Sequence, residues 1–304
     1  MDWQAEITAA RDRIRGHARV TPATRLTLAG HDIEVKLEQM QLTGSFKARG
    51  AFNTLLSVEV PPAGVVAASG GNHGAAVGHA AAALGHPAHI FVPEVAGPSK
   101  IAVIERSGAT CHVVPGLYAD ALDAARTHEA RTGAIQVHAY DAVPTVAGQG
   151  TCFAEWDAQG LDADTVLIAV GGGGLIAGAL AHWAGRRKVV AVEPAQSRAL
   201  HAALEAGEPV DVPVSGVGAN ALGARRIGSI CFELARTGNC EAVTVPDDAI
   251  VAAQAALWQE ARQLVEPAGA CALAGLLSGA YRPAPGERVA VLVCGANPAP
   301  DPLG

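Results

Sequence analysis

The sequence predicts an α/β fold built on parallel sheets covered by helices, and three observations support this prediction. Short apolar strands alternate with helix-like segments along much of the 304 residues, a rhythm that is typical of parallel sheets. Two glycine-rich loops lie where an expected strand passes into an expected helix. Half of the residues are hydrophobic and only 4% are aromatic, which fits a globular α/β protein with a large core.

The elements follow from local patterns, taken in chain order. Apolar residues at helical spacing predict a helix within residues 3–17, which Pro22 ends. Alternation of apolar and charged residues predicts a half-buried strand at 33–37, and a second helix begins at Lys47. The remaining expected strands are 65–68, 88–92, 110–114, 134–137, 165–170, 189–192 and 289–293, and the remaining helices are 72–84, a helix after 98, 118–131, 150–156, one ending near 184, 247–264 and 268–279. Residues 211–228 are rich in glycine and give no clear prediction.

Charge, cysteine spacing and hydropathy exclude several classes of protein. The net charge is -7, and the longest basic run, Arg186–Lys188, is too short for a nucleic-acid site. The six cysteines form no CxxC pair, so neither a zinc site nor a disulfide framework is expected, and a reducing cytoplasm fits best. The uncharged run Thr165–Trp183 is as long as a membrane span, but four glycines interrupt it. We therefore expect no membrane segment and no signal peptide.

A rare lysine begins the second helix. Only four lysines occur in the chain, and Lys47 follows a Gly44-Ser45-Phe46 turn in which Ser45 is the expected N-cap. The positive end of the helix dipole favours a neutral amine at Lys47. Such an amine is nucleophilic and can form a Schiff base with a carbonyl. Taken alone, a solvated surface lysine is the competing interpretation.

Two glycine-rich loops are candidate anion sites. Ser69–Gly74 and Gly171–Gly174 each precede an expected helix, where backbone amides can bind an anion or cradle a phosphate. Tight packing turns are the alternative for both loops. The second loop also fits the dinucleotide pattern through Gly172, Gly174 and Ala177, with Glu193 at the end of the next strand. That interpretation would indicate an NAD-dependent oxidoreductase, and it gives Lys47 no role.

Six short motifs in one order carry a family resemblance. They are Gly44-Ser45-Phe46-Lys47, Ser69-Gly70-Gly71-Asn72-His73-Gly74, Ala147-Gly148-Gln149-Gly150-Thr151, Gly171 to Gly174, Glu266-Pro267-Ala268-Gly269-Ala270 and Cys294-Gly295-Ala296-Asn297. Together they resemble the serine/threonine dehydratases (ammonia-lyases), which are related to serine racemase and have the fold of the tryptophan synthase β subunit, fold type II of the pyridoxal-phosphate enzymes. The resemblance covers about Thr21 to Asn297. It implies two parallel-sheet domains with pyridoxal 5'-phosphate in the cleft between them: a large cofactor-binding domain (1–62 and 142–304) and a small substrate-side domain (63–141).

The resemblance implies a role for each matching residue. Lys47 is the catalytic residue and holds the cofactor as a Schiff base, and Phe46 packs on the cofactor ring. Asn72 hydrogen-bonds the phenolic oxygen, and Cys294 faces the pyridine nitrogen, where many relatives have serine. The phosphate is expected at Gly171, Gly172, Gly173 and Gly174, and the substrate carboxylate at Ser69, Gly70, Gly71, Asn72 and His73. Glu266 is expected near the ring or the substrate. Individually, His73 and Glu266 could be ordinary helix-start residues and Cys294 a small buried hydrophobe.

The implied activity is β-elimination from L-threonine or L-serine, which yields a 2-oxo acid and ammonia. The implied protein is a cytoplasmic homodimer that acts on a small amino acid and has no nucleic-acid or membrane partner. Serine racemases carry a second serine where this chain has Gly70, so racemisation should be weak. Residues 213–220 lack the acidic residues that bind a divalent cation in some relatives, so no metal is expected. A serine or aspartate racemase, a 3-hydroxyaspartate dehydratase, a sulfhydrylase and a non-catalytic cofactor-binding protein remain alternatives.

Overall fold

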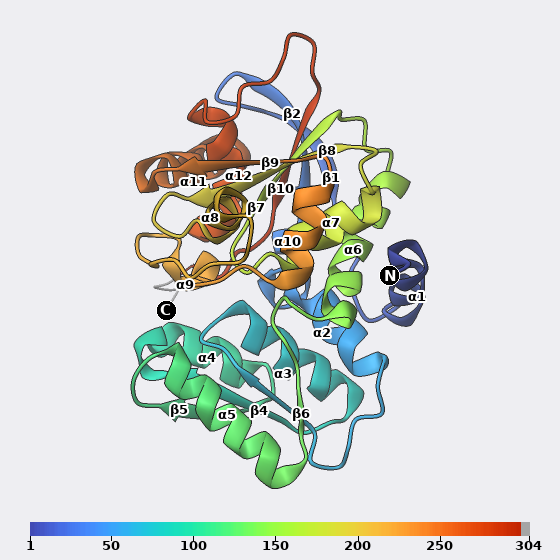
Figure 1. The fold of residues 1–304 in the computed structure, drawn as a ribbon, viewed down its shortest axis with the longest axis vertical. Coiled ribbons are helices and arrows are strands. Elements are labelled where there is room, and N and C mark those ends of the chain that lie inside the picture. Colours follow the sequence, from blue (N-terminus) through green and yellow to red (C-terminus); the bar gives the residue numbers. More distant parts are fainter. Residues whose placement is uncertain (299–304) are drawn as a thin grey trace.

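Two separate sheets form the framework of the protein. The computed structural model describes residues 1–298 and shows a larger and a smaller group of layers, each with helices against its sheet (Figure 1). The larger sheet has six strands in the order β1–β2–β10–β7–β8–β9. Its strands are β1 (Ala23–Leu28), β2 (His31–Leu37), β7 (Thr165–Ala169), β8 (Lys188–Pro194), β9 (Cys240–Val245) and β10 (Val289–Val293).

The smaller sheet is parallel throughout. Its order is β5–β4–β3–β6, and every strand comes from the middle of the chain. The strands are β3 (Val65–Ala68), β4 (Ala88–Pro93), β5 (Thr110–Val114) and β6 (Ile135–Gln136). The helices between them are α3 (Asn72–Leu84), α4 (Pro98–Arg106) and α5 (Tyr118–Thr132), with a short 3-10 turn at Glu94–Ala96.

The helices of the larger group come from both ends of the chain. They are α1 (Trp3–Arg13), α6 (Val143–Ala158), α7 (Gly174–Trp183), α8 (Ala199–Ala206), α9 (Ala219–Leu222), α10 (Ser229–Thr237), α11 (Asp247–Ala261) and α12 (Pro267–Leu277), with 3-10 turns at Glu38–Met40 and Leu42–Gly44. Helix α2 (Lys47–Leu56) lies between the two groups, because it packs on α6 while its buried apolar residues share a core with β3, β4 and α3. Strands β7 and β10 are buried along their whole length. Continuous apolar runs of this kind are what a parallel sheet covered on both faces requires.

One edge of the larger sheet departs from the predicted parallel arrangement. β1 pairs with β2 in antiparallel register, from Ala23 opposite Lys36 to Leu28 opposite His31. The two-residue turn, Ala29–Gly30, has positive φ at both positions (47° and 81°), which is the conformation that closes a tight hairpin. Strands β1 and β9 and helices α8, α9 and α10 were not predicted, and the helix expected at 150–156 begins earlier, at Val143.

A buried ion network fixes α2, the helix that begins at Lys47. Arg49 pairs with Glu38 (Nε to Oε1, 2.5 Å) and with Glu155 (Nη2 to Oε2, 3.0 Å), and Lys36 donates to Glu155 at 2.6 Å. Thr21 completes the group by donating its hydroxyl to Glu38 Oε2 at 2.6 Å. Two cations and two carboxylates are thus matched inside the protein, as buried charges must be. The network ties α2 to the turn that follows β2 and to α6.

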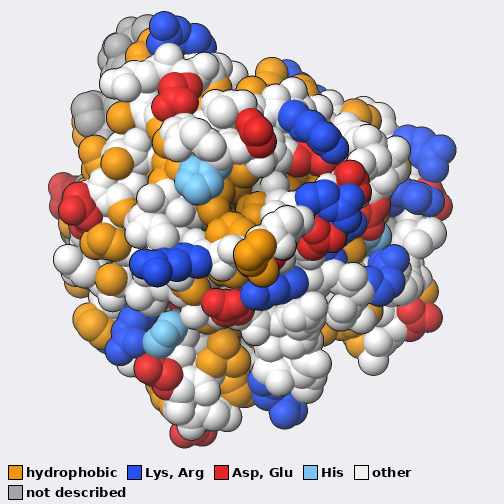
Figure 2. All heavy atoms as spheres, turned by 90° about the horizontal axis from the view of Figure 1, so that it is seen from above, with side chains coloured by type: hydrophobic (Ala, Val, Ile, Leu, Met, Phe, Trp, Pro, Cys, Tyr) orange, Lys and Arg blue, Asp and Glu red, His pale blue; other side chains and the backbone are white. Residues whose placement is uncertain are grey.

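The surface carries no extended patch of one charge on the face shown in Figure 2. Acidic and basic side chains are interspersed there with apolar and neutral ones. None of the helices formed by residues 1–298 combines the length and the apolar character that a transmembrane crossing needs.

Candidate active site

Three predicted site segments lie at the carboxyl ends of parallel strands. Ser69 follows β3, Gly171 follows β7 and Cys294 follows β10. Ligands of α/β proteins bind beyond these ends, where loops and helix starts converge. Hydrogen bonds connect the Cys294 and Asn72 segments to the chain just before Lys47. The Gly171 segment instead packs against Tyr140, the neighbour of the Lys47 acceptor Ala139.

Lys47 lies at the first turn of α2, as predicted, with its amine directed at the backbone beyond β6. Its Nζ donates to Ala139 O at 2.7 Å and lies 5.1 Å from the centre of the Phe46 ring. Burial lowers the pKa of Lys47 to about 8, and the nearby Cys294 opposes part of this shift. A substantial share of this amine is therefore neutral near pH 8 and able to act as a nucleophile or base.

Ser45 is not the N-cap of this helix, contrary to the prediction. Phe46 precedes Lys47 at the cap position, and no side chain caps the helix. Ser45 is extended (φ -160°, ψ 158°) because it pairs with Gly295 in an antiparallel bridge. Its hydroxyl is buried and has no partner within residues 1–298. The same pairing brings Phe46 N to within 3.3 Å of Cys294 O, which joins the Lys47 segment to the end of β10.

Cys294 is a neutral thiol in this setting. It is buried, and its Sγ donates to Ala268 O at 3.3 Å. Burial raises the pKa of Cys294, with a further contribution from Glu266. The thiol therefore keeps its proton at neutral pH, and it can offer a weak, uncharged hydrogen bond to a ligand atom.

Asn72 is held at the start of α3 by two side chains. Its Nδ2 donates to Glu266 Oε1 at 2.5 Å, and its Oδ1 accepts from Asn297 Nδ2 at 2.8 Å. Asn297 also donates to Thr43 O at 2.7 Å. Burial raises the pKa of Glu266 to about 7, partly offset by the Asn72 hydrogen bond and by Lys100. Because an amide nitrogen has two protons, Asn72 keeps one N–H for another partner.

The rest of the Asn72 loop is tightly packed. Ser69 Oγ accepts from Gly71 N at 3.2 Å, and a Cβ at Gly70 would lie 2.8 Å from the Ala96 methyl. His73 Nε2 lies 2.8 Å from Val137 O, so Nε2 carries the proton. Burial lowers the pKa of His73 to about 3, with Lys47 adding to the effect. The His73 ring is thus neutral, and its Nε2 proton is used in the hydrogen bond to the backbone just after β6.

The tetraglycine loop forms a turn between β7 and α7 in which neighbouring residues leave no room for side chains. Gly173 has φ of 92°, and a Cβ there would lie 2.6 Å from Cys231 Sγ. A Cβ at Gly172 would overlap the Tyr140 ring. The backbone amides of Gly171, Gly172 and Gly173 have no acceptor within the described part of the chain. Free amides at a helix N-terminus bind an anion such as a phosphate.

The contacts of Glu193 speak against a dinucleotide site at this loop. Glu193 is fully buried, and both of its carboxylate oxygens accept backbone amides at the start of α8, from Leu200 and from His201, each at 2.8 Å. A ribose-binding acid would need a free oxygen facing the loop. Glu193 instead caps α8, a helix that was not predicted.

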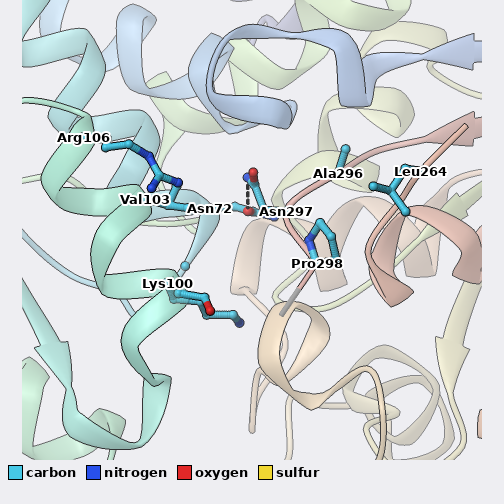
Figure 3. A pocket seen from close by; sticks show the side chains of 10 residues that line it. Asn72, Lys100, Val103, Arg106, Leu264, Ala296, Asn297 and Pro298 are labelled. Carbon is cyan, nitrogen blue, oxygen red and sulfur yellow. Dashed lines mark hydrogen bonds between the residues drawn. The ribbon is translucent and has the colours of Figure 1, made fainter. Parts of the chain in front are cut away.

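A small cavity adjoins the Asn72 loop on the side of α4. It encloses about 200 Å³ and is lined by Gly71, Asn72, Ser99, Lys100, Val103, Arg106, Leu264, Ala296, Asn297 and Pro298. Figure 3 shows Lys100, Val103 and Arg106 on α4, facing Leu264 and residues 296–298 from the larger group. Sequence reasoning missed Lys100, Arg106 and the bonding role of Asn297. The scarcity of lysine was the one available signal for Lys100.

These residues fit a pyridoxal phosphate group. The unpartnered amides of the tetraglycine loop and the unpartnered Ser45 hydroxyl suit a phosphate or another anion. The Lys47 amine suits an aldehyde, and the neutral Cys294 thiol suits a ring nitrogen. Within residues 1–298, no group of three or more His, Cys, Asp or Glu residues is arranged to hold a metal ion.

Comparison with known proteins gives the same family throughout. The family model described as pyridoxal-phosphate dependent enzyme matches residues 14–295. Phenylserine dehydratase from Ralstonia pickettii is 35% identical over 300 residues, covering 96% of this chain and 92% of the relative. The biosynthetic L-threonine dehydratase of Escherichia coli is also 35% identical, over 92% of this chain but only 56% of its own length.

Solved structures agree with the sequence matches. A threonine deaminase from T.th. superposes with a TM-score of 0.89 at 32% identity, over 98% of this chain and 99% of that one. Maize serine racemase superposes with a TM-score of 0.91 at 29% identity, over 96% and 93%. The predicted resemblance and the predicted fold type are therefore confirmed. The chain belongs to the family of pyridoxal-phosphate-dependent enzymes.

Proposed function

We propose that the protein is a dehydratase (ammonia-lyase) that removes water and then ammonia from a small β-hydroxy amino acid. L-threonine and L-serine are the expected substrates, and phenylserine joins them because a similar relative is named for it. The observation that carries the proposal is the Lys47 amine, whose lowered pKa and position near Cys294 suit a base at Cα. We also propose that the protein works in the cytoplasm as a homodimer, and that the cofactor lies between the domains 63–141 and 1–62 with 142–304.

Lys47 has two tasks in this scheme. Its Nζ would hold the cofactor, and as a free neutral amine it would accept the Cα proton of the substrate. When bound, pyridoxal phosphate supplies the electron-withdrawing ring that makes this proton acidic. The 2.7 Å hydrogen bond from Lys47 to Ala139 O shows that the side chain can rest against the backbone when it is not engaged.

The surrounding residues orient the reacting groups. Asn72 would offer its remaining N–H to the phenolic oxygen of the cofactor, with Glu266 and Asn297 fixing the amide plane. The amides of the tetraglycine loop would hold the phosphate. The uncharged Cys294 thiol would serve the ring nitrogen as a weak hydrogen-bond donor, so that nitrogen would have no strong proton donor. A ring that withdraws electrons less strongly suits loss of a β-hydroxyl more than it suits a long-lived carbanion. Ser69, Gly71 and His73 border the place proposed for the substrate carboxylate.

Gly70 separates this scheme from racemisation. A racemase needs one acid/base group on each face of Cα, and Lys47 supplies only one of them. At position 70 there is no side chain, and the space beside it is taken by the Ala96 methyl. Lys47 is thus the single proposed proton-transfer side chain at Cα, which favours elimination.

The direct test is turnover by the reconstituted protein. We expect a visible absorption band on adding pyridoxal phosphate, its change on adding L-threonine, L-serine or phenylserine, and release of one 2-oxo acid and one ammonia per substrate. Lys47→Ala should abolish turnover while the protein still folds, as checked by circular dichroism. A protein that takes up no cofactor, or that holds it without consuming any β-hydroxy amino acid, would contradict the proposal.

A further inference from the structure

The cavity beside the Asn72 loop carries two cationic side chains that the proposed chemistry does not use. Lys100 lies in the first turn of α4 and Arg106 at its end, and both line the cavity together with Asn72 and Asn297. The protein as a whole has a net charge of -7. A cavity with two cations is therefore a local exception that calls for an anionic partner.

Lys100 is buried without a matching carboxylate contact. Its exposed fraction is only 8%, and its sole hydrogen bond among the described residues runs from Nζ to Asn220 O, at 3.3 Å. An ammonium group has three donors, so two remain unused. Burial lowers the pKa of Lys100, while the Glu266 carboxylate works in the opposite direction. A buried ammonium with spare donors is costly unless an anion reaches it.

The position of Lys100 relates it to the Asn72 loop. Its Nζ lies 3.7 Å from the place where a Cβ on Gly71 would stand, so the amine faces the backbone of that loop. Arg106 lies at the far end of α4, is exposed and forms no ion pair within residues 1–298. In Figure 3 both side chains project from α4 toward the segment 296–298. The two cations thus bracket one wall of the cavity.

The remaining walls suit a short carbon chain. Val103 and Leu264 supply apolar surface, while Asn72 and Asn297 supply amides that are already bonded to each other. The one buried carboxylate close by is Glu266, which Asn72 engages, and its pKa of about 7 leaves it partly protonated at neutral pH. The cavity therefore keeps an excess of positive charge even when Glu266 is ionised.

We propose that this cavity is a carboxylate-binding site in which Lys100 forms the primary ion pair and Arg106 the second. The ligand class is a small carboxylic acid with a short carbon chain, of the size of malonate or succinate. The carboxylate belongs either to the substrate, as in a β-hydroxy amino acid with an acidic side chain, or to a free dicarboxylic acid. The substrate source rests on the proposed function, and the site itself does not.

The test measures binding and turnover separately. Malonate and succinate are titrated by calorimetry into the cofactor-loaded wild-type protein and into Lys100→Met, Lys100→Arg and Arg106→Met variants. Arg126→Met is the matched control, because Arg126 is an exposed arginine that pairs with Asp123 on α5, away from the cavity. Loss of one charged hydrogen-bonding partner should weaken carboxylate binding by about tenfold or more in Lys100→Met. Lys100→Arg should retain much of the affinity, and Arg126→Met all of it.

Turnover then identifies the source of the carboxylate. If the substrate side chain supplies it, kcat/KM for 3-hydroxyaspartate falls about tenfold or more in Lys100→Met while that for L-serine falls far less. If a free acid supplies it, both substrates keep their kcat/KM and malonate alters L-serine turnover only while Lys100 is present. Each of these results supports the site.

The proposal is overturned if malonate and succinate bind equally well to wild-type, Lys100→Met and Arg106→Met proteins, or bind to none of them. Binding does not depend on turnover. If only the proposed dehydratase activity were wrong, the protein would form no 2-oxo acid but would still bind malonate or succinate in a way that depends on Lys100. Failure of the site would appear as unchanged binding in a protein that still forms 2-oxo acid.

Discussion

The Asn72 amide and the Glu266 carboxyl are joined by a hydrogen bond of 2.5 Å between residues that lie 194 positions apart. Glu266 immediately precedes α12 of the larger group, and Asn72 begins α3 beside the smaller sheet. The bond therefore connects the two groups at the site itself. It also sets the direction of the amide that is proposed to meet the cofactor, so the protonation of Glu266 and the position of Asn72 are linked.

Replacing Glu266 by glutamine should change how stability depends on pH. Glu266 has a pKa raised from 4.5 to about 7, so the folded protein holds its proton where the unfolded chain has lost it. Stability from this group is complete below pH 4.5 and is lost as the pH rises through 7, by about 3 kcal/mol in all. Glu266→Gln removes this loss and keeps an oxygen for Asn72. Urea unfolding at pH 5 and pH 8 should show the variant gaining stability relative to wild type at the higher pH. An equal difference at both pH values would contradict the shift.

Replacing Gly173 by alanine should weaken cofactor binding. An alanine there would have to adopt φ of 92° and would press on Cys231 Sγ, and the left-handed conformation alone costs about 1–2 kcal/mol. The turn would move, and its amides would no longer converge. We expect the cofactor dissociation constant to rise about tenfold or more, measured by fluorescence titration.

Gly185→Ala is the matched control for Gly173→Ala. Gly185 lies just beyond the other end of α7, has φ of 83°, and has open space where a Cβ would stand. It should lose a similar backbone energy without a change in cofactor affinity. Equal affinity losses in the two variants would mean that general destabilisation, not the shape of the turn, sets cofactor binding.

Local signals were enough to predict where Lys47, the Asn72 loop and the tetraglycine loop stand. Each lies at a junction that glycines and apolar runs mark within a few residues. The prediction that Ser45 is the N-cap was wrong because its backbone is extended by pairing with Gly295. The residues near Ser45 in the sequence do not indicate this contact. Strand β1 was missed because much of its sequence is polar, and because its turn uses Ala29 at positive φ, where glycine or asparagine is the usual signal.

The contacts that orient the site side chains were beyond sequence reasoning for a related reason. Asn297 reaches Asn72 and Thr43, and Tyr140 covers Gly172, only after the two sheets have formed and met. Periodicity predicts which face of an element is buried but not which distant side chain it meets. Asn297 could be named from its motif, whereas its bonds to Asn72 and Thr43 depend on the folded arrangement of segments far apart in the sequence.

Removing Arg49 should destabilise the protein strongly. Arg49→Met leaves the fully buried Glu38 without its main partner, and breaking a buried pair in this way costs about 3–5 kcal/mol. The double variant Glu38→Met/Arg49→Met should lose less, because it leaves no uncompensated carboxylate there, while Glu155 keeps Lys36. Urea unfolding of the three proteins tests this. If the double variant were the least stable, the ion pair itself would be the stabilising element.

The rate of cofactor uptake should follow the titration of Lys47. With a pKa lowered from 10.5 to about 8, the reactive neutral form grows about tenfold per pH unit below 8 and levels off above it. Stopped-flow absorbance from pH 6 to 10 should therefore show a plateau beginning near pH 8. Because Glu266 titrates near 7, the same profile is measured in Glu266→Gln, which should keep the plateau. A rate that continues to climb to pH 10 would mean an unshifted lysine.

Introducing a serine at Gly70 should not by itself produce a racemase. The new Cβ would stand 2.8 Å from the Ala96 methyl, so the loop that carries Asn72 must shift, and we expect Gly70→Ser to lose dehydratase activity by about tenfold or more.

In Gly70→Ser/Ala96→Gly the methyl is gone and the loop can stay in place. This double variant should regain dehydratase activity, and the added hydroxyl can then reach the second face of Cα. Chiral chromatography of serine recovered from partial turnover checks the outcome. D-serine formed by the double variant but not by either single variant would show that both a second acid/base group and room for it are required; D-serine formed readily by the wild type would contradict the role given to Gly70.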